Sequence, residues 1–466
     1  GYTNGSYAMI YGYPGGTNRY EISYGIKLKN EIDNPSLVGL RDIRLKAMHE
    51  RMVKDPAVKL KLADSYSGIA NYYKFYGGET EQLEKYHVFE NKQEFEKKFA
   101  AWAQGKPDFE NIISDYQKNY AKWTPYAKGR VYLIEGILGS PLTMFASSFA
   151  PLERALVQTN RTQSDVDRAI KALEDSREKF LAKEDIPSDK IIMAKTAMMY
   201  YHDVDKNQQP TAFFKALQAK YGSLDDLSTY QKWAEDVFAN TIILNDAKWQ
   251  DFVKNPDAVT LQDDPAYSYA SAFVTNYNNK YAPIYREFTA TNDELGRMYL
   301  KGVMEMDPVK AKKMYPDANF SMRVSYGNVK SYSPRDGMEY NYYTTSDGIL
   351  QKYIPGDYEF DLPSKEIDLL RKKDFGQYFD KKHNAMMINF ITTNDITGGN
   401  SGSPVIDGEG NLIGLAFDGN YEALSHKLQF DKDLNRTICV DVRYVLWCID
   451  KMGGAKNIIN ELKLVR

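Results

Sequence analysis

The sequence predicts an α+β protein in which one β-domain is interrupted by a large, irregular α-helical domain. Three observations indicate this arrangement. Strand-like alternation occupies residues 1–28 and returns in residues 307–466, and helical periodicity fills residues 29–306 between them. The helical block has no fixed repeat length, so it is not a solenoid. Residues 1–28 are too few to bury a sheet of their own, so we expect them to pair with strands in residues 320–440.

In chain order, the first segment should hold two strands joined by a turn at residues 14–16, PGG. A helix then begins near Asn34 and stops at Asp55, where Pro56 starts the next helix. We expect that second helix to end at the pair Gly77 and Gly78. Further helical patterns cover residues 91–103, 108–123, 162–183, 190–201, 210–221, 228–240 and 265–306.

The second β region begins with alternation over residues 320–332 and a tyrosine-rich stretch at 339–345. Strand patterns follow at residues 385–393, 411–418 and 437–440. Two short helical patterns, over residues 441–451 and 455–464, close the chain.

Composition narrows the classes of function. At 466 residues we expect two or three domains. The 60 basic and 63 acidic residues nearly cancel, which argues against nucleic acid or an anionic membrane as a partner. No apolar stretch reaches the ~20 residues needed to span a bilayer. The two cysteines, Cys439 and Cys448, are expected to be free thiols, and we expect no metal site and no cofactor.

The most informative stretch is residues 397–404, TGGNSGSP, between two predicted strands. Glycine on both sides suits a nucleophilic serine, Ser401, on a tight exposed loop. The backbone amides of Gly399 and Ser401 can point into one hollow and stabilise an oxyanion during acyl transfer. The alternative is an ordinary glycine-rich hairpin whose serine bonds only its own turn.

This loop and its surroundings resemble the bacterial dipeptidyl-peptidase 7/dipeptidyl-peptidase 11 family of serine peptidases. The resemblance is carried, in the family's order, by GYPG at 12–15, TNRY at 17–20, YPDAN at 315–319, TNDI at 393–396, GLAFDGN at 414–420 and VRYVL at 442–446. It implies a trypsin-like double β-barrel with a helical domain inserted in it. It also implies that a first barrel, a signal peptide and the catalytic histidine and aspartate precede this chain. The implied location is the periplasm or cell surface of a Gram-negative bacterium.

The family resemblance also assigns substrate-binding residues. It implies that the carboxylate of Asp418 receives the free α-amino group of the peptide, as a charged ammonium requires a fixed counter-charge. Members that prefer an acidic second residue carry arginine where this chain has Gly419, so glycine implies apolar or aromatic preference. The family's second amine-binding residue, an asparagine, best matches Asn71. The alternatives are a strand-end aspartate and a helix-surface asparagine.

None of the five histidines has the surroundings of the family's catalytic base. His49, His87 and His202 fall in or between helical patterns, and His383 and His426 are expected at the surface. We therefore expect no base in this chain and no activity from it alone. The leading hypothesis is a serine dipeptidyl-peptidase that takes peptides with a free N-terminus. The sequence does not decide whether the protein forms a homodimer. The alternatives are a non-catalytic peptide-binding module and a glutamyl-type endopeptidase.

Overall fold

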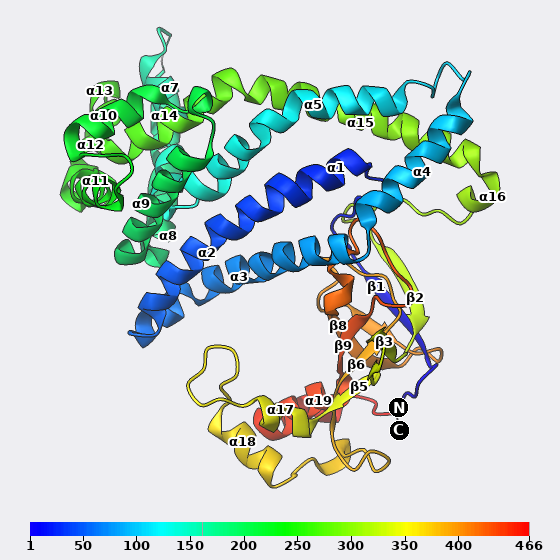
Figure 1. Ribbon diagram of the computed structural model, residues 1–466. Helices are drawn as coiled ribbons and strands as arrows, with labels where there is room; N and C mark the ends of the chain where they lie inside the picture. The colour runs from blue at the N-terminus through cyan, green and yellow to red at the C-terminus, as the bar shows by residue number, and fades with distance from the viewer. Residues whose placement is uncertain (161, 466) are drawn as a thin grey trace. The chain divides into compact units, whose positions relative to one another are not determined.

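A computed structural model describes residues 1–160 and 162–465 and divides them into two compact units. One unit contains residues 1–21, 82–88 and 309–466, and the other contains residues 22–81 and 89–308. The fold is α+β, mostly helical, with an antiparallel sheet (Figure 1). The chain enters the sheet, leaves it for the helical unit and returns to it, as the alternation of patterns predicts.

The sheet has seven strands in the order β2-β1-β7-β8-β9-β6-β5, and a separate hairpin is formed by β3 and β4. The strands are β1 (Tyr7–Gly12), β2 (Arg323–Asn328), β3 (Tyr332–Arg335), β4 (Met338–Tyr340), β5 (Tyr343–Thr345), β6 (Met387–Thr392), β7 (Pro404–Ile406), β8 (Leu412–Gly419) and β9 (Thr437–Asp441). β1 pairs with β2 along its whole length and with β7 at Met9 and Ile10. The predicted pairing of the first segment with strands after residue 320 is confirmed.

The sheet curls so that the chain after its edge strand β2 meets the end of β6, the neighbour of the other edge strand. Beyond β2, Val329 forms an antiparallel bridge with Thr392 at the end of β6, and the Thr393 amide donates to the Asn328 carbonyl at 2.9 Å. The enclosed core is built from alanine, valine and isoleucine side chains together with Tyr342, Phe390 and Cys439. The helices of this unit are α17 (Ser346–Lys352), α18 (Ser364–Arg371), α19 (Val442–Trp447) and α20 (Lys456–Glu461), with a π-helical turn, η6 (Cys448–Met452), after α19.

The last residues of α3 and α16 and the first residue of α4 belong to the β unit, and the rest of the following helices builds the helical unit. They are α1 (Ser23–Leu28), α2 (Asn34–Met52), α3 (Pro56–Lys85), α4 (Val88–Ala103), α5 (Ile112–Val131), α6 (Pro141–Ser147), α7 (Ala150–Val157), α8 (Gln163–Lys183), α9 (Ile186–Asp203), α10 (Thr211–Tyr221), α11 (Leu227–Asn240), α12 (Asp246–Lys254), α13 (Ala258–Asp263), α14 (Pro265–Lys280), α15 (Ala282–Met306) and α16 (Pro308–Ala311). α5 and α15 lie side by side (Figure 1). Aromatic pairs such as Trp233 and Tyr269, with ring centroids 4.6 Å apart, fill the core.

Two sequence predictions for the helical boundaries are wrong. Residues 23–28 form α1 instead of a second strand, and its two buried residues, Ser23 and Ile26, are three residues apart and therefore share one helical face. α3 does not end at Gly77 and Gly78 but continues to Lys85. The following residue, Glu79, is buried and accepts a hydrogen bond from Asn34 at 3.0 Å, so tertiary contacts hold the helix through the glycine pair.

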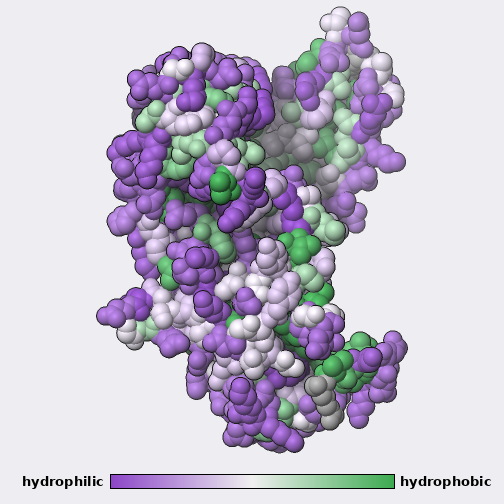
Figure 2. Space-filling model, turned by 90° about the vertical axis from the view of Figure 1, so that its right-hand side faces the viewer, coloured by the Kyte–Doolittle hydropathy of each residue, from purple (hydrophilic) through white to green (hydrophobic). Residues whose placement is uncertain are grey.

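Within the described chain, no single helix has the length and apolarity needed to cross a bilayer. One bent pair of helical segments, 112–137 and 141–157, has the necessary length and apolarity when the two are taken together, and it is bent by 106°. The face of the molecule in Figure 2 is largely hydrophilic, with hydrophobic side chains gathered in separate patches.

His426 is not the surface residue that its sequence context predicts. Its ring is half-buried, with Nδ1 2.5 Å from the Ala423 carbonyl oxygen and Nε2 shielded from solvent without a partner among the described residues. Burial lowers the pKa of His426 from its ordinary 6.5 to about 4. His383 is also more enclosed than expected, since its Nδ1 lies 3.1 Å from Asp380 and its ring packs on Tyr343.

The half-buried His426, whose Nε2 is shielded from solvent, should make the β unit sensitive to acid. Between pH 6.5 and about 4 the unfolded chain binds a proton at this residue and the folded chain does not, so stability is present above pH 6.5 and falls as the pH drops. The loss is at most about 3 kcal/mol. Urea unfolding of His426→Asn at pH 7 and pH 4.5 should show a smaller acid-induced loss than the wild type. The exposed His49→Asn serves as the control, and an unchanged loss in His426→Asn would contradict this prediction.

Candidate active site

Ser401 lies in the loop between β6 and β7, and its neighbours fix the loop's shape. The buried Asn400 accepts a bond from the Thr397 amide through its side-chain oxygen at 3.2 Å, and its own amide donates to the Thr397 carbonyl at 3.0 Å. The Gly402 amide donates to the Ala416 carbonyl of β8 at 2.7 Å. These bonds hold the loop by its ends and leave its tip exposed, with Ser401 at the surface.

The Ser401 hydroxyl donates to the backbone carbonyl of Phe417 at 3.2 Å. Phe417 is exposed at an irregularity in the β8–β9 ladder, where the register shifts between Ala416 and Asp418. Such bulges turn backbone groups and side chains out of the sheet and are common beside active sites. Here the bulge places the Phe417 carbonyl beside Ser401, and Asp418 is the residue that follows Phe417.

Gly399 adopts a φ of +108°, and a Cβ atom there would lie 2.3 Å from the carbonyl oxygen of Tyr13. Only glycine fits this position, because both the backbone conformation and the space exclude a side chain. The amides of Gly399 and Ser401 donate to no acceptor in the part of the chain that the structure describes. Two such amides, two residues apart on one loop, are the donors that an oxyanion requires.

The turn after β1 supports this loop from one side. The Gly15 amide donates to the Gly398 carbonyl at 2.7 Å, and a Cβ on Gly12 would lie 2.3 Å from Asn400 Nδ2 and 2.5 Å from Ser403 Oγ. The backbone of residues 12–15, one of the segments that carry the family resemblance, therefore packs directly against the serine loop.

Replacing Gly12 by alanine should displace the serine loop. The added methyl group has no space, so we expect a loss of about 1–3 kcal/mol in unfolding free energy, measured by urea denaturation. Gly16→Ala is the matched control, because a Cβ at Gly16 meets nothing within 4 Å. Equal stabilities of the two variants would contradict the packing described here.

Three further segments quoted for the resemblance meet beside the loop. Arg19 Nη2 donates to Asp395 Oδ1 at 2.7 Å, and the Tyr315 hydroxyl donates to the same carboxylate at 2.9 Å. The Arg19 amide donates to Asp317 at 2.9 Å. This network connects residues 17–20 and 315–319 to the start of the serine loop. Segments that are far apart in the sequence therefore form one hydrogen-bonded group in the structure.

Asp418 and Gly419 lie at the end of β8, opposite Ile438 and Thr437 of β9. Asp418 Oδ1 accepts the Gly419 amide at 2.8 Å, and the side chain is exposed. Displacement of water by nearby protein raises the pKa of Asp418 above its ordinary value, opposed by that amide. At Gly419 a Cβ would lie 3.3 Å from the Ala423 methyl, so a side chain fits after a small shift.

The structure thus brings Ser401, Gly399, Asp418 and Gly419 into one region of the β unit. Asn71 belongs to the helical unit, on α3, where its side chain is exposed. Its role remains a prediction.

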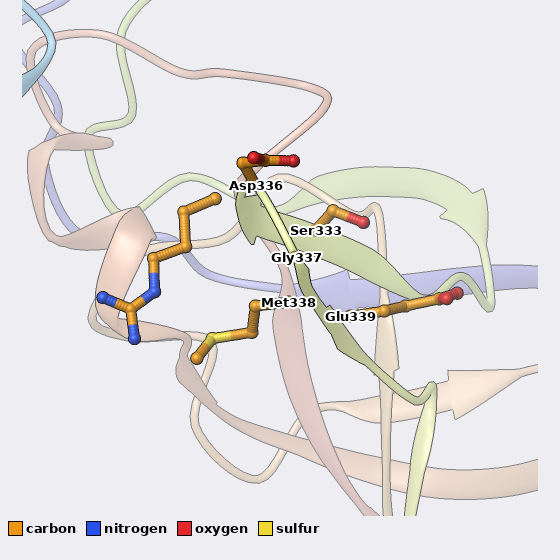
Figure 3. Close-up of a pocket in the computed structure, with 6 residues that line it drawn as sticks. Ser333, Asp336, Gly337, Met338 and Glu339 are labelled. Carbon is orange, nitrogen blue, oxygen red and sulfur yellow. The ribbon is translucent and has the colours of Figure 1, made fainter.

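Other features of the described residues lie outside this region. An open pocket of about 670 Å³ on the β3–β4 hairpin is lined by Ser333, Arg335, Asp336, Gly337, Met338 and Glu339 (Figure 3), and it contains none of the predicted site residues.

Comparison with known families gives a match to the model of peptidase S46 over residues 1–464. The chain belongs to the peptidase S46 family. The match covers nearly every residue, so both units and the serine loop are parts of the family's fold. The predicted family resemblance is confirmed.

Relatives within the S46 family carry two different names. The chain is 35% identical to dipeptidyl-peptidase 7 of Capnocytophaga gingivalis over its whole length, which is 64% of that relative. It is equally identical, at 35%, to the Asp/Glu-specific dipeptidyl-peptidase of Flavobacterium psychrophilum, with 98% of the chain and 63% of the relative covered. The chain therefore spans less than two thirds of these relatives, and they do not decide which second residue it prefers.

A solved structure agrees with the fold. The crystal structure of Porphyromonas endodontalis DPP11 in complex with the dipeptide Arg-Glu matches with a TM-score of 0.87 at 27% identity, covering 99% of this chain and 65% of that one. An S46 homologue with this fold therefore binds a dipeptide.

Proposed function

We propose that the protein is a serine dipeptidyl-peptidase of the S46 family and that Ser401 is its nucleophile. The observation that carries the proposal is an exposed hydroxyl beside two backbone amides, those of Gly399 and Ser401, that have no acceptor among the described residues. The Ser401 oxygen attacks the carbonyl carbon of the peptide's second residue, and the amides hold the resulting oxyanion. The shortened peptide leaves with the proton, and water then releases the dipeptide from the acyl-enzyme.

The base that takes the Ser401 proton is proposed to come from a part of the protein outside these 466 residues. His87, His383 and His426 belong to the same unit as the serine, and none of them hydrogen-bonds with Ser401 in the described structure. About a third of the length of that relative lies outside the part that this chain covers, which leaves room for a histidine–aspartate pair. The family resemblance supports the same division, and the proposed location in the periplasm or at the cell surface rests on it alone.

Exopeptidase action is proposed to depend on Asp418. When the second residue of a peptide acylates Ser401, the free amine is on the first residue, one residue before the reacting carbonyl. Asp418 directly follows Phe417, whose carbonyl accepts the bond from Ser401. A carboxylate there offers the counter-charge that a partly desolvated ammonium needs. Asn71 is proposed as a second ligand of that amine, on the family resemblance.

We propose that the protein prefers an apolar or aromatic second residue, because Gly419 has no charged side chain that could pair with an acidic one. We expect Gly419→Arg to favour an acidic second residue, because an arginine–carboxylate pair gains about 1.5–3 kcal/mol. The ratio of kcat/KM for glutamate over leucine at the second position should rise about 10–150-fold. The methyl group of Ala423, 3.3 Å from the new Cβ, has to move slightly, so Gly419→Ala is the control for crowding alone. An unchanged ratio would refute this role.

Product analysis tests the proposed function. The protein encoded by the full open reading frame should release dipeptides from a free-amine peptide, detected by mass spectrometry, and nothing from the acetylated peptide. Cleavage of both peptides would indicate an endopeptidase, and cleavage of neither would indicate a binding module.

A further inference from the structure

Phe320 is an exposed aromatic residue in an unusual backbone conformation beside the serine loop. Its φ is +64°, a region that bulky residues rarely occupy. The Phe320 amide donates to the Pro14 carbonyl at 2.8 Å, which fixes this conformation. The side chain is nonetheless 70% exposed. The fold thus holds an aromatic ring at the surface in a defined place, and core packing does not explain it.

The ring borders the proposed oxyanion hole. Phe320 Cζ lies 2.9 Å from the position of a Cβ on Gly15, and Phe320 Cε1 lies 3.4 Å from the corresponding position on Gly399. Because neither glycine has a side chain, the ring reaches the backbone whose amide would hold the oxyanion.

Strand order divides the surroundings of Ser401 into two sides. The loop precedes β7, which lies between β8 on one side and β1, followed by β2, on the other. On the β8 side Ser401 contacts Phe417, the residue before Asp418. On the β1 side Gly399 contacts the turn after β1 and the ring of Phe320. Asp418 and Phe320 therefore lie on opposite sides of the serine loop.

A peptide bound for reaction must pass over the loop from one side to the other. Its amine and first two residues occupy the Asp418 side under the proposed function, so its third residue, the first of the leaving peptide, must lie on the opposite side. We propose that Phe320 is a specificity-determining residue that contacts an apolar side chain on this third residue. The inference rests on the proposed function and adds a leaving-peptide subsite to it.

Competition between two substrates tests this subsite. Two tetrapeptides, identical except for leucine or glycine at the third position, are mixed with the protein of the full open reading frame, and dipeptide release is followed through the two leaving peptides. We expect the wild type to prefer leucine by about tenfold in kcat/KM, since apolar contact distinguishes side chains on that scale. Phe320→Gly, which removes the ring and suits the positive φ, should reduce the ratio to about one to two. Phe320→Tyr should keep the preference.

Tyr326→Ala is the matched control, because Tyr326 is 74% exposed on β2, the strand that follows Phe320, and lies six residues away, on the order of 20 Å along an extended chain. It should leave the ratio unchanged. A wild type without preference, a ratio insensitive to Phe320→Gly, or an equal fall in Tyr326→Ala would overturn the subsite. Absence of dipeptide release from either peptide would overturn the proposed function as well, so the two failures are distinguishable.

Discussion

Ser401→Ala in the protein of the full open reading frame should lower kcat for dipeptide release by about 10⁶-fold, the loss seen when a serine peptidase loses its nucleophile. The acyl-enzyme cannot form without the hydroxyl, and only oxyanion stabilisation and substrate positioning remain. Stability should change by less than about 0.5 kcal/mol, because Ser401 is exposed and its side chain makes one hydrogen bond within the described structure, to the Phe417 carbonyl at 3.2 Å.

Steady-state assays with a dipeptide-coupled fluorogenic amide measure this loss, and thermal unfolding checks the fold. Ser333→Ala, at an exposed serine of the β3–β4 hairpin, is the control and should retain full activity. Residual activity within tenfold of the wild type in Ser401→Ala would show that another residue is the nucleophile.

Asp418→Asn should lower kcat/KM for free-amine substrates by about 30–150-fold, which corresponds to the 2–3 kcal/mol of a charged hydrogen bond. The substitution keeps the side chain's size and its bond to the Gly419 amide but removes the charge that pairs with the substrate ammonium. The raised pKa of Asp418 adds a pH signature: protonation weakens amine binding at a higher pH than for an ordinary aspartate. In a plot of kcat/KM against pH, the variant should therefore lack the fall at low pH that protonation of Asp418 causes in the wild type.

The matched control is Asp336→Asn, an exposed aspartate of the β3–β4 hairpin, which should keep the wild-type rate. If Asp418→Asn cleaved free-amine peptides at the wild-type rate, the amine would have to be held elsewhere and the reason for exopeptidase action would be lost.

The β unit could be predicted where side chains alternate over several residues. β6, β8 and β9 coincide closely with the predicted strands; buried positions recur every second residue throughout β9 and over most of β6, and the alternation in β8 breaks only where its ladder shifts register. β7 was missed because it has three residues and begins with Pro404, directly after the glycine-rich loop. Its pairing with β1 and β8 depends on tertiary contacts that no local pattern shows.

The candidate site could be predicted in part. Glycine spacing around Ser401 predicted a tight exposed loop with the amides of Gly399 and Ser401 as a pair of donors, since glycine permits the backbone conformations that such a loop requires. Phe320 could not be found in this way, because a phenylalanine at positive φ contradicts its own preference and is imposed by the bond to Pro14. His426 was misassigned for a similar reason: its flanking residues are polar, and its burial arises from long-range packing.

Covalent labelling tests the central proposal most directly. A dipeptidyl phosphonate ester with a free amine is incubated with the full-length protein, and the modified residue is identified by peptide mapping with mass spectrometry. We predict a single adduct on Ser401, slowed at least tenfold in Asp418→Asn and absent with the N-acetylated reagent. An adduct on a different residue, or equal labelling of Ser401 by the acetylated reagent, would contradict the proposal.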